Sequence, residues 1–297
     1  MSPMLARFKN FLRRFPRLVS AYRDLHWRRV ILADWRDAVF GDRITSGVTP
    51  LGFHLVTRNH PANRAMLQGA FEPQETAVLL QHLPQTDVFV DVGANVGYYT
   101  LLALKHGKHA VAVEPQPRNL QCLYAGLEAN RWEGRPEIFP VGLGPQPGMA
   151  TLYGASGPSA SIVRNWAKYG SGYRQTIPLL TLDIVLADRF VDRSVFIKID
   201  VEGYEYQVLQ GASRTAGRMQ HVTWLVEICF DEYHPSGRNP NFRDTFEWFW
   251  SRGYEAGTAD SARARVLPQD VERWCRLGKC DSGTINYLFS KPGAGTG

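Results

Sequence analysis

The amino-acid sequence predicts an α/β fold, in which a doubly wound and mostly parallel β-sheet carries helices on both faces. Short runs of apolar and β-branched residues alternate with segments of helical periodicity along most of the chain, a pattern typical of this fold class. Two glycines follow one of those runs at the start of a helix, and acidic residues end several others. With 297 residues, 44% of them hydrophobic, the chain has enough material for one large core.

The segment before the predicted sheet is a lead-in of mixed character. Residues 44–63 alternate well enough between apolar and polar positions to predict a short hairpin. A helix begins near Pro73, because proline suits a first helical turn and the acids Glu72 and Glu75 suit its positive end. We expect this helix to lead into the first central strand.

The next stretch is the one around which the rest of the chain is organised. Residues 88–90 predict a strand buried on both faces, and Asp91 stands at its carboxyl end. Gly93 and Gly97 permit a tight turn and a close backbone approach before a helix over 98–105. The unsatisfied N–H groups at the start of that helix indicate a ligand-binding turn.

A second strand over 110–113 ends in Glu114, 23 residues after Asp91. Neighbouring parallel strands end at the same edge of a sheet, so the Glu114 carboxylate can accept both ribose hydroxyls of a nucleoside bound at the glycine turn. The turn lacks the Gly-x-Gly-x-x-Gly spacing of dinucleotide-binding folds, which argues against a pyrophosphate ligand.

The middle of the chain predicts a helix over 117–130 and a third strand over 137–141. Residues 151–174 are rich in Gly, Ser and Tyr, which indicates either a mobile loop beside the site or a plain surface loop. An added strand over 175–181 and a short helix from Asp183 follow.

Two further strands repeat the design of the first. Residues 194–200 predict a buried strand that ends in Asp200, a helix over 203–210 follows, and the strand over 222–228 carries Glu227 near its end. The acids at these strand ends should therefore lie beside the glycine turn. Beyond them, residues 242–250 form an aromatic-rich helix that we interpret as core packing, and 254–256 and 285–290 predict an antiparallel pair at the sheet edge.

Three motifs resemble the FkbM family of S-adenosylmethionine-dependent methyltransferases, in the same order and at similar separations. They are Asp91-Val-Gly-Ala-Asn-Val-Gly97, Val113-Glu114-Pro115 and Lys198-Ile-Asp-Val-Glu-Gly203. The resemblance covers about residues 48–290. It implies the Rossmann-like, seven-stranded sheet of class I methyltransferases with its last strand antiparallel, S-adenosylmethionine as cofactor, and O-methylation of sugars or polyketide hydroxyls.

The site residues expected from the motifs and the resemblance fall into two overlapping groups. The cofactor-binding group is Asp91, Gly93, Asn95, Gly97, Glu114 and Asp200. The catalytic group is Asp200, Glu202 and Glu227, of which Asp200 is the first candidate for the base that takes the acceptor proton. Asp200 and Glu227 jointly holding a divalent cation is a disfavoured alternative, since two carboxylates are too few ligands, and we expect no metal site.

Charge is distributed unevenly, although the net charge is +6. Residues 1–30 contain eight basic residues and one acid, a net +7, so the remaining 26 basic and 27 acidic residues are nearly balanced. A near-neutral body lacks the basic face that nucleic-acid binding requires. We therefore expect a small-molecule or saccharide acceptor, and nucleic acid is a less favoured partner.

The expected organisation is a basic helical arm over residues 1–45, a single methyltransferase domain over 46–290 with its core from about residue 86, and a disordered tail over 291–297. Apolar residues recur at helical spacing in the arm, with arginines and Lys9 between them. Two interpretations stay open: a helix packed on the domain with its charges in water, or a basic amphipathic helix resting on an anionic membrane surface through residues 1–30.

The four cysteines show neither Cys-x-x-Cys pairing nor metal-ligand spacing next to histidine, which indicates a reducing compartment. The basic start of the chain lacks the apolar run of a secretory signal. We expect a cytoplasmic protein, peripheral at the inner membrane face if the arm binds lipid.

Three functions follow from these observations. The first is S-adenosylmethionine-dependent O-methylation of a hydroxyl on a saccharide, glycan or related natural product. The second is RNA methylation in which the basic arm holds the substrate. The third is a non-catalytic, cofactor-binding scaffold in a glycan-assembly complex.

The membrane interpretation of the arm predicts binding to anionic vesicles. Each Lys or Arg near an anionic surface contributes about 1 kcal/mol, so the full chain should sediment with anionic liposomes and be released by added salt. Neutral liposomes are the control. Full solubility beside anionic vesicles, or sedimentation that salt does not change, would support the packed-helix interpretation.

Overall fold

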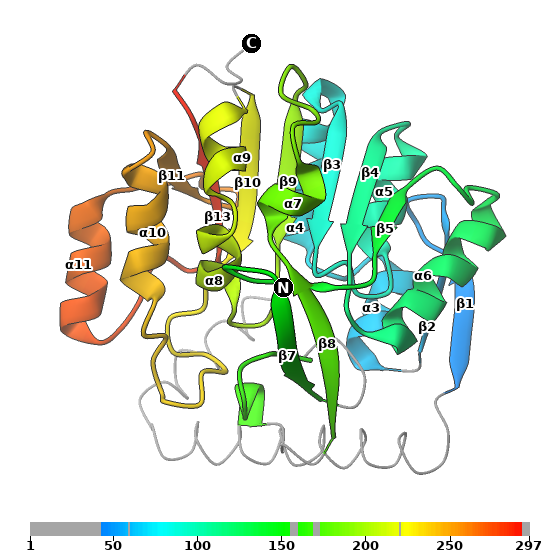
Figure 1. Ribbon diagram of the computed structural model, residues 1–297, viewed down its shortest axis with the longest axis horizontal. Coiled ribbons are helices and arrows are strands. Elements are labelled where there is room, and N and C mark those ends of the chain that lie inside the picture. Colours follow the sequence, from blue (N-terminus) through cyan, green and yellow to red (C-terminus); the bar gives the residue numbers. More distant parts are fainter. Residues whose placement is uncertain (1–42, 59, 155–159, 169–172, 220, 293–297) are drawn as a thin grey trace, which may run out of the picture. The chain divides into compact units, whose positions relative to one another are not determined.

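A central β-sheet organises the part of the chain that the computed structural model describes, namely residues 43–58, 60–154, 160–168, 173–219 and 221–292 (Figure 1). Its strands are β3 (Val88–Val92), β4 (His109–Val113), β5 (Glu137–Phe139), β9 (Val195–Ile199), β10 (Val222–Glu227), β11 (Glu255–Thr258), β12 (Arg265–Val266) and β13 (Asn286–Ser290). They lie in the order β12-β11-β13-β10-β9-β3-β4-β5. The predicted α/β class and mostly parallel sheet are confirmed.

The number of strands differs from the expected seven. The five neighbouring strands β5, β4, β3, β9 and β10 are parallel to one another. Strand β13 runs antiparallel to both β10 and β11, as the resemblance implied. The eighth strand, β12, pairs with β11 at the edge through two residues. So short a strand carries no alternation of polar and apolar positions, which is why the sequence pattern did not predict it.

The helices of the described chain cover both faces of this sheet (Figure 1). They are α3 (Pro61–Gln68), α4 (Pro73–His82), α5 (Tyr98–Lys105), α6 (Pro117–Asn130), α7 (Leu182–Leu186), α8 (Glu205–Gln210), α9 (Ser213–Arg218), α10 (Phe242–Trp250) and α11 (Pro268–Leu277). The predicted helices over 98–105, 117–130 and 242–250 have the expected bounds. The predicted helix from residue 203 begins at Glu205, because Gly203 has a left-handed backbone with φ 93°.

Alternation along the strands assigns the side chains to the two faces. Val88, Val90 and Val92 pack in one apolar cluster with residues of α8, α9, α10 and α11. Phe89 of the same strand packs in a second cluster with residues of α4, α5 and α6. Because successive side chains point to opposite faces, Asp91 faces the second cluster. Phe196 belongs to that cluster, so Lys198, two residues on, faces it as well.

The aromatic helix α10 is a core-packing element, as expected. Phe242, Phe246 and Phe249 are buried, and the Phe249 ring stacks on Phe289 of β13 with centroids 3.8 Å apart and an interplanar angle of 10°. The aromatic residues therefore tie α10 to the antiparallel side of the sheet.

The lead-in forms the predicted hairpin, with β1 (Ile44–Val48) and β2 (His54–Arg58) paired antiparallel. A small second sheet of β6 (Gly142–Leu143), β7 (Gly148–Tyr153) and β8 (Arg174–Leu180) follows β5, and β7 pairs antiparallel with β8. The start of the predicted loop over 151–174 is therefore strand, whereas residues 155–159 and 169–172 lie outside the described residues. Figure 1 shows β7 and β8 extending past the lower ends of the central strands.

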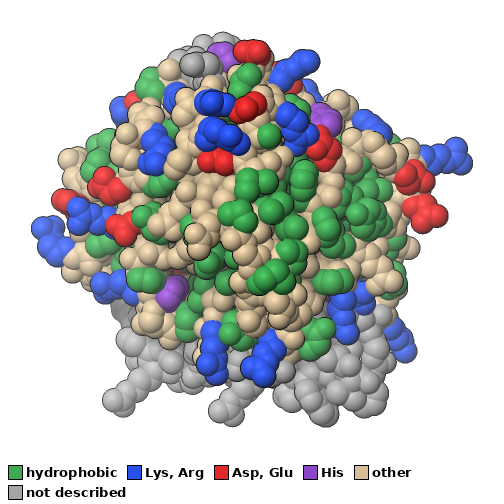
Figure 2. Space-filling view, in the orientation of Figure 1, with side chains coloured by type: hydrophobic (Ala, Val, Ile, Leu, Met, Phe, Trp, Pro, Cys, Tyr) green, Lys and Arg blue, Asp and Glu red, His purple; other side chains and the backbone are tan. Residues whose placement is uncertain are grey.

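The described residues from Ile44 onward belong to one compact unit. Residues 1–42 of the predicted arm and most of the predicted tail lie outside the described residues, and the arm as predicted ends too late, because Ile44 and Thr45 belong to β1. No helix in the described part of the chain is both long and apolar enough to cross a membrane. On the face seen in Figure 2, basic and acidic side chains are interspersed around the rim and hydrophobic side chains gather toward the middle.

Candidate functional site

The site lies where the direction of strand order reverses, between β3 and β9. From β3 the chain proceeds outward through β4 to β5, whereas β9 is followed by β10 on the opposite side. Ligands of doubly wound sheets bind outside the carboxyl ends of the strands at this switch point. The two loops there are in direct contact, because the Asp200 N–H donates to Val92 O at 3.0 Å.

The two glycines of the turn are required by the backbone and by close packing. Gly93 has φ 87°, and a Cβ there would lie 1.9 Å from the carbonyl oxygen of Asp200. Gly97 has φ 89°, and a Cβ there would lie 2.3 Å from Leu123 Cδ1 of α6. Both conformations are ones that side chains rarely adopt. The glycines therefore bring the β3 turn against the β9 loop and α6.

Glu114 follows β4 and anchors the turn from the other side. Its Oε2 accepts the Asn95 N–H at 2.8 Å, and its Oε1 accepts the Gln116 N–H at 2.8 Å and the Asn119 amide at 3.3 Å. Burial raises the pKa of Glu114 to about 7, although these hydrogen bonds oppose the shift. A carboxylate offers about four lone-pair sites, so the three donors leave room for one more hydrogen bond. If Glu114 accepts two ribose hydroxyls, the 3.3 Å hydrogen bond from the Asn119 amide has to break.

Asp91 does not lie at the tip of its strand, as the sequence suggested, but within β3. It is 1% exposed, and its Oδ2 accepts the Thr100 hydroxyl at 2.6 Å. Its Oδ1 is a buried atom with no hydrogen-bond partner among the described residues. Burial raises the pKa of Asp91, and Lys198 opposes that shift. Asp91 is therefore an interior acid beneath the turn rather than a residue of its rim.

Lys198, to which the sequence analysis gave no role, provides a buried positive charge for this group of acids. Its side chain is 5% exposed, and its Nζ lies 2.6 Å from Asp200 Oδ2 and 4.8 Å from the centre of the Tyr99 ring. Strand register pairs it with Asp91. Burial would lower the pKa of Lys198, but Asp200, Glu72 and Asp91 together raise it well above its usual value. The sequence signal that could have placed Lys198 in the site is its position two residues before Asp200, because residues two apart on a strand point to the same face.

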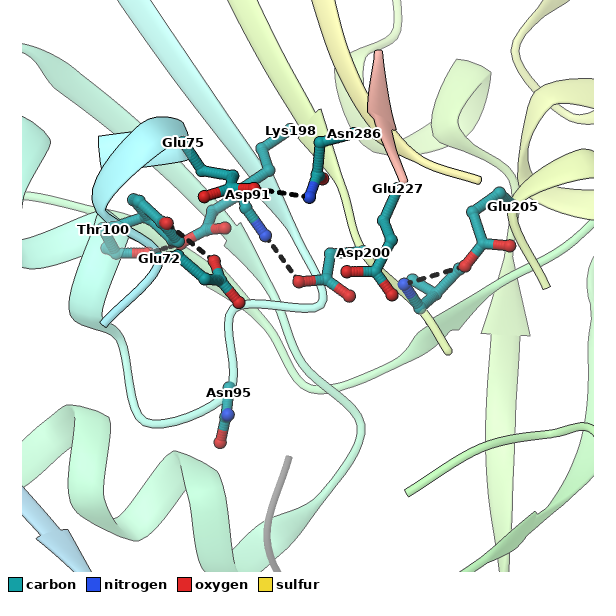
Figure 3. A network of polar contacts seen from close by, with 12 residues as sticks. Glu72, Glu75, Asp91, Asn95, Thr100, Lys198, Asp200, Glu205, Glu227 and Asn286 are labelled. Carbon is teal, nitrogen blue, oxygen red and sulfur yellow. Dashed lines mark hydrogen bonds and ion pairs between the residues drawn. The ribbon is translucent and has the colours of Figure 1, made fainter. Parts of the chain in front are cut away.

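Glu72 is a second residue that sequence reasoning did not place in the site. It precedes α4 with a left-handed backbone, φ 38°, and its Oε2 accepts the Tyr99 hydroxyl at 2.7 Å. Burial raises the pKa of Glu72 to about 7, which Lys198 opposes. Glu72, which precedes α4, thus adds an acid near the carboxyl ends of β3 and β9 (Figure 3).

The three predicted catalytic acids are brought together at the ends of β9 and β10. Figure 3 shows the Asp200 and Glu227 carboxylates next to each other. Burial raises the pKa of Glu227 well above its usual value, and Asp200 and Glu202 raise it further by repulsion. Burial and repulsion from Asp200 do the same for Glu202. Like charges so close resist simultaneous ionisation, so Glu202 and Glu227 hold a proton more strongly than a free carboxyl group does.

These acids differ in what holds them. The Asp200 carboxylate is paired with Lys198, and the Glu202 Oε2 accepts the Trp166 indole N–H at 2.5 Å. The Glu227 Oε1 is contacted by the Cys229 thiol at 3.6 Å, a weak interaction. Asn95 lies apart from this group (Figure 3), with φ 51° and a buried Oδ1 that has no partner among the described residues.

The described residues contain no group of three or more His, Cys, Asp or Glu side chains arranged to hold a metal ion.

Comparison with known proteins identifies one family and several similar structures. A family model described as the methyltransferase FkbM domain matches residues 91–256, more than half of the chain. No curated protein matches the sequence. A crystal structure of methyltransferase FkbM from Methylobacillus flagellatus KT is 20% identical with a TM-score of 0.45, and the match covers 69% of this chain and 44% of that one.

Two other solved structures are similar at lower identity. An O-methyltransferase from Bacillus cereus in complex with SAH is 11% identical with a TM-score of 0.42, and covers 73% of this chain and 80% of its own. A precorrin-6y C5,15-methyltransferase from Geobacter metallireducens GS-15 is 12% identical with a TM-score of 0.39, and covers 74% of this chain and 90% of its own.

The buried acids predict that the protein without ligand loses stability as the pH rises. Burial raises the pKa of Glu205 to about 7 in the folded chain, whereas the unfolded value is near 4.5. Its contribution to stability is therefore complete below about pH 4.5 and is lost as the pH rises through about 7. The free energy of unfolding from chemical denaturation should fall between pH 5 and pH 8.

Glu205→Gln is the matched variant, because its amide oxygen can still accept the Gly203 N–H that Glu205 Oε1 accepts at 2.8 Å. The free energy of unfolding of Glu205→Gln should fall less between pH 5 and pH 8 than that of the unsubstituted chain. The lowered pKa values of His82 and His234 act in the opposite direction but are common to both proteins. If the free energy of unfolding falls equally with pH in the two proteins, Glu205 does not cause the pH dependence.

Proposed function

We propose that this chain, which belongs to the FkbM methyltransferase family, transfers a methyl group from S-adenosylmethionine to a hydroxyl of a saccharide or related natural-product acceptor. The family membership rests on the match over residues 91–256 and agrees with the three motifs of the sequence. The observation that supports the reaction is the group of acids Asp200, Glu202 and Glu227, which lies beside the glycine turn at the switch point of the sheet.

The residues around the turn fit a cofactor with hydrogen-bond donors and positive charge. Buried acceptor atoms of Asp91 and Asn95 have no partner among the described residues, and unsatisfied buried acceptors of this kind call for a ligand or water. In this proposal Asp91, Gly93, Asn95, Gly97, Glu114 and Asp200 hold S-adenosylmethionine. When bound, the cofactor supplies an electrophilic methyl group on a positively charged sulfur, and carboxylates nearby attract that charge.

The protein's own task is to take the proton from the acceptor hydroxyl. A base must lie about 2.6–3.2 Å from that hydroxyl and have a pKa close to the working pH. Burial and repulsion raise the pKa of Glu227 above the usual value of a carboxyl group, in the direction of that condition, and its contact with the Cys229 thiol is weak. The ion pair between Asp200 and Lys198 favours a role for Asp200 in holding the cofactor. Glu227 is thus our preferred base, with Asp200 and Glu202 as alternatives.

The place of action is a further part of the proposal. The cysteine pattern supports the cytoplasm, and the basic residues 1–30 support peripheral contact with the inner membrane face, where lipid-linked sugars would be available.

A methyl-transfer assay with radiolabelled S-adenosylmethionine tests the proposed function on glycan, lipid-linked sugar and RNA pools. Label should enter a saccharide fraction, where O-methyl ethers survive mild base. Label in RNA would favour the RNA methyltransferase alternative. Cofactor binding without transfer to any pool would favour the scaffold alternative, and activity lost on chelation would favour a cation held by Asp200 and Glu227.

Replacement of the base should reduce turnover with little effect on cofactor affinity. Glu227→Gln is expected to lower turnover by about 10²- to 10⁴-fold, because a positioned base contributes about that much. Asp200→Asn should instead weaken cofactor binding, measured by calorimetry, as well as turnover. Near-normal turnover in Glu227→Gln, together with normal cofactor affinity and low turnover in Asp200→Asn, would assign the base to Asp200.

The proposed ribose contact predicts that Glu114→Ala binds S-adenosylmethionine at least about tenfold more weakly. A hydrogen bond to a charged group contributes about 1.5–3 kcal/mol, and the substitution also releases the Asn95 N–H. Asn119→Ala is the matched control, because it removes only the 3.3 Å contact to Oε1 and should change affinity less. Unchanged affinity in Glu114→Ala would show that Glu114 serves the turn alone.

A further inference from the structure

A second cluster of side chains contacts the acids through Glu202, and the proposed cofactor-binding residues do not include it. It consists of Trp166, Glu202, Tyr233 and His234. The Trp166 indole donates to Glu202 Oε2 at 2.5 Å, and its ring lies 6.1 Å from the Tyr233 ring and 5.9 Å from the His234 ring, centre to centre. This packing requires glycine at position 203, because a Cβ there would lie 2.3 Å from Trp166 Cζ3.

The backbone of this cluster is held in unusual conformations. Asn165, Ala167, Glu202 and Tyr233 all have left-handed φ values, between 51° and 68°. The Ala167 N–H donates to Tyr233 O at 2.8 Å, which locks two of these residues together. Non-glycine residues in such conformations persist only when the surrounding structure enforces them, and they concentrate at functional sites. Among the large hydrophobic side chains of these segments, Tyr233 is the exposed one and Trp166 is buried.

Tyr233 combines exposure with closeness to the acids. The residue is 40% exposed, although its ring lies tilted at 50° to the Trp166 ring with the two centres 6.1 Å apart. Burial of the hydroxyl raises the pKa of Tyr233 to about 12, and the neighbouring acids Glu227 and Glu202 raise it in the same direction. The exposed ring is therefore within electrostatic reach of our preferred base.

We propose that Tyr233 and His234 form the acceptor subsite, where they stack against the apolar face of a neutral sugar ring whose hydroxyl is presented to Glu227. This inference rests on the proposed function, whose acceptor it narrows to an uncharged saccharide. Trp166 is a positioning residue, since it holds Glu202 and supports the Tyr233 ring.

The chemistry of the cluster selects this acceptor. One face of a pyranose ring carries C–H groups, which are attracted to the negative face of an aromatic ring, while its rim of hydroxyls suits acids that accept hydrogen bonds. Glu202, Glu227 and Glu232 offer no positive charge to a phosphate or carboxylate group, and whichever of them is ionised repels such a group. Stacking of a nucleobase on Tyr233 would bring phosphates against these acids, which disfavours RNA.

Arg238, a basic residue five positions after Tyr233, is engaged elsewhere. The Arg238 guanidinium lies over the Phe230 ring at 5.4 Å and donates to Cys275 O of α11 at 3.3 Å. It therefore does not offset the negative charge beside Tyr233.

Saturation-transfer NMR on the full chain tests the subsite directly. The probes are neutral methyl hexopyranosides, methyl glucuronide as their anionic counterpart, and a short single-stranded RNA. Neutral glycosides should receive saturation at the C–H protons of one ring face, and methyl glucuronide much less. Tyr233→Ala should abolish this transfer, whereas Tyr233→Phe should keep it, because stacking requires the ring and not the hydroxyl. Tyr124→Ala, which removes another exposed tyrosine from α6, is the matched control.

Kinetics and calorimetry separate this inference from the proposed function. Tyr233→Ala should raise the acceptor KM about two- to tenfold and leave S-adenosylmethionine affinity unchanged, and His234→Ala, which keeps Tyr233, should act in the same direction. An unchanged acceptor KM in both variants, with methyl transfer intact, would overturn the subsite and leave the function standing. Absence of saturation for every glycoside, or RNA binding that depends on Tyr233, would overturn the saccharide assignment.

Discussion

The site depends on one buried positive charge, the Lys198 ammonium, placed among carboxylates at the boundary of β3 and β9. Strand register sets it beside Asp91, and its position two residues before Asp200 lets it form the 2.6 Å ion pair with that residue. A buried charge is tolerated only when it is paired, and loss of one partner from a buried pair costs about 3–5 kcal/mol. Lys198 therefore allows several acids to remain close together at the end of the sheet.

Two constraints bring the ends of β3 and β9 to the same place. Gly93 allows the β3 turn to approach the carbonyl of Asp200, and the Asp200 N–H donates to Val92 O. Glu114 then holds the other side of the turn through the Asn95 N–H. The turn is thus fixed by side chains and backbone from both neighbouring strands, so its orientation does not depend on a ligand. Such preorganisation reduces the ordering that binding would otherwise require.

The acids of the site outnumber its cation, and this excess has a chemical use in the proposed reaction. Glu72, Glu114 and Glu205 have pKa values of about 7 because burial disfavours their charged forms. A positively charged ligand would favour ionisation of acids close to it and would offset part of the burial cost. In our proposal the same electrostatics, extended to Glu202 and Glu227, disfavours anionic acceptors.

The sequence by itself determined the α/β class, the glycine turn and the acids at the strand ends, because periodicity and glycine positions are local properties. The family resemblance of its motifs also implied that the last strand is antiparallel, which the pairing of β13 with β10 confirms. Only the tertiary structure revealed the burial of Asp91 within β3, the pairing of Lys198 with Asp200, and the contributions of Glu72 and Trp166 from distant segments. Those depend on strand register and on contacts between residues far apart in the chain, which no local pattern encodes.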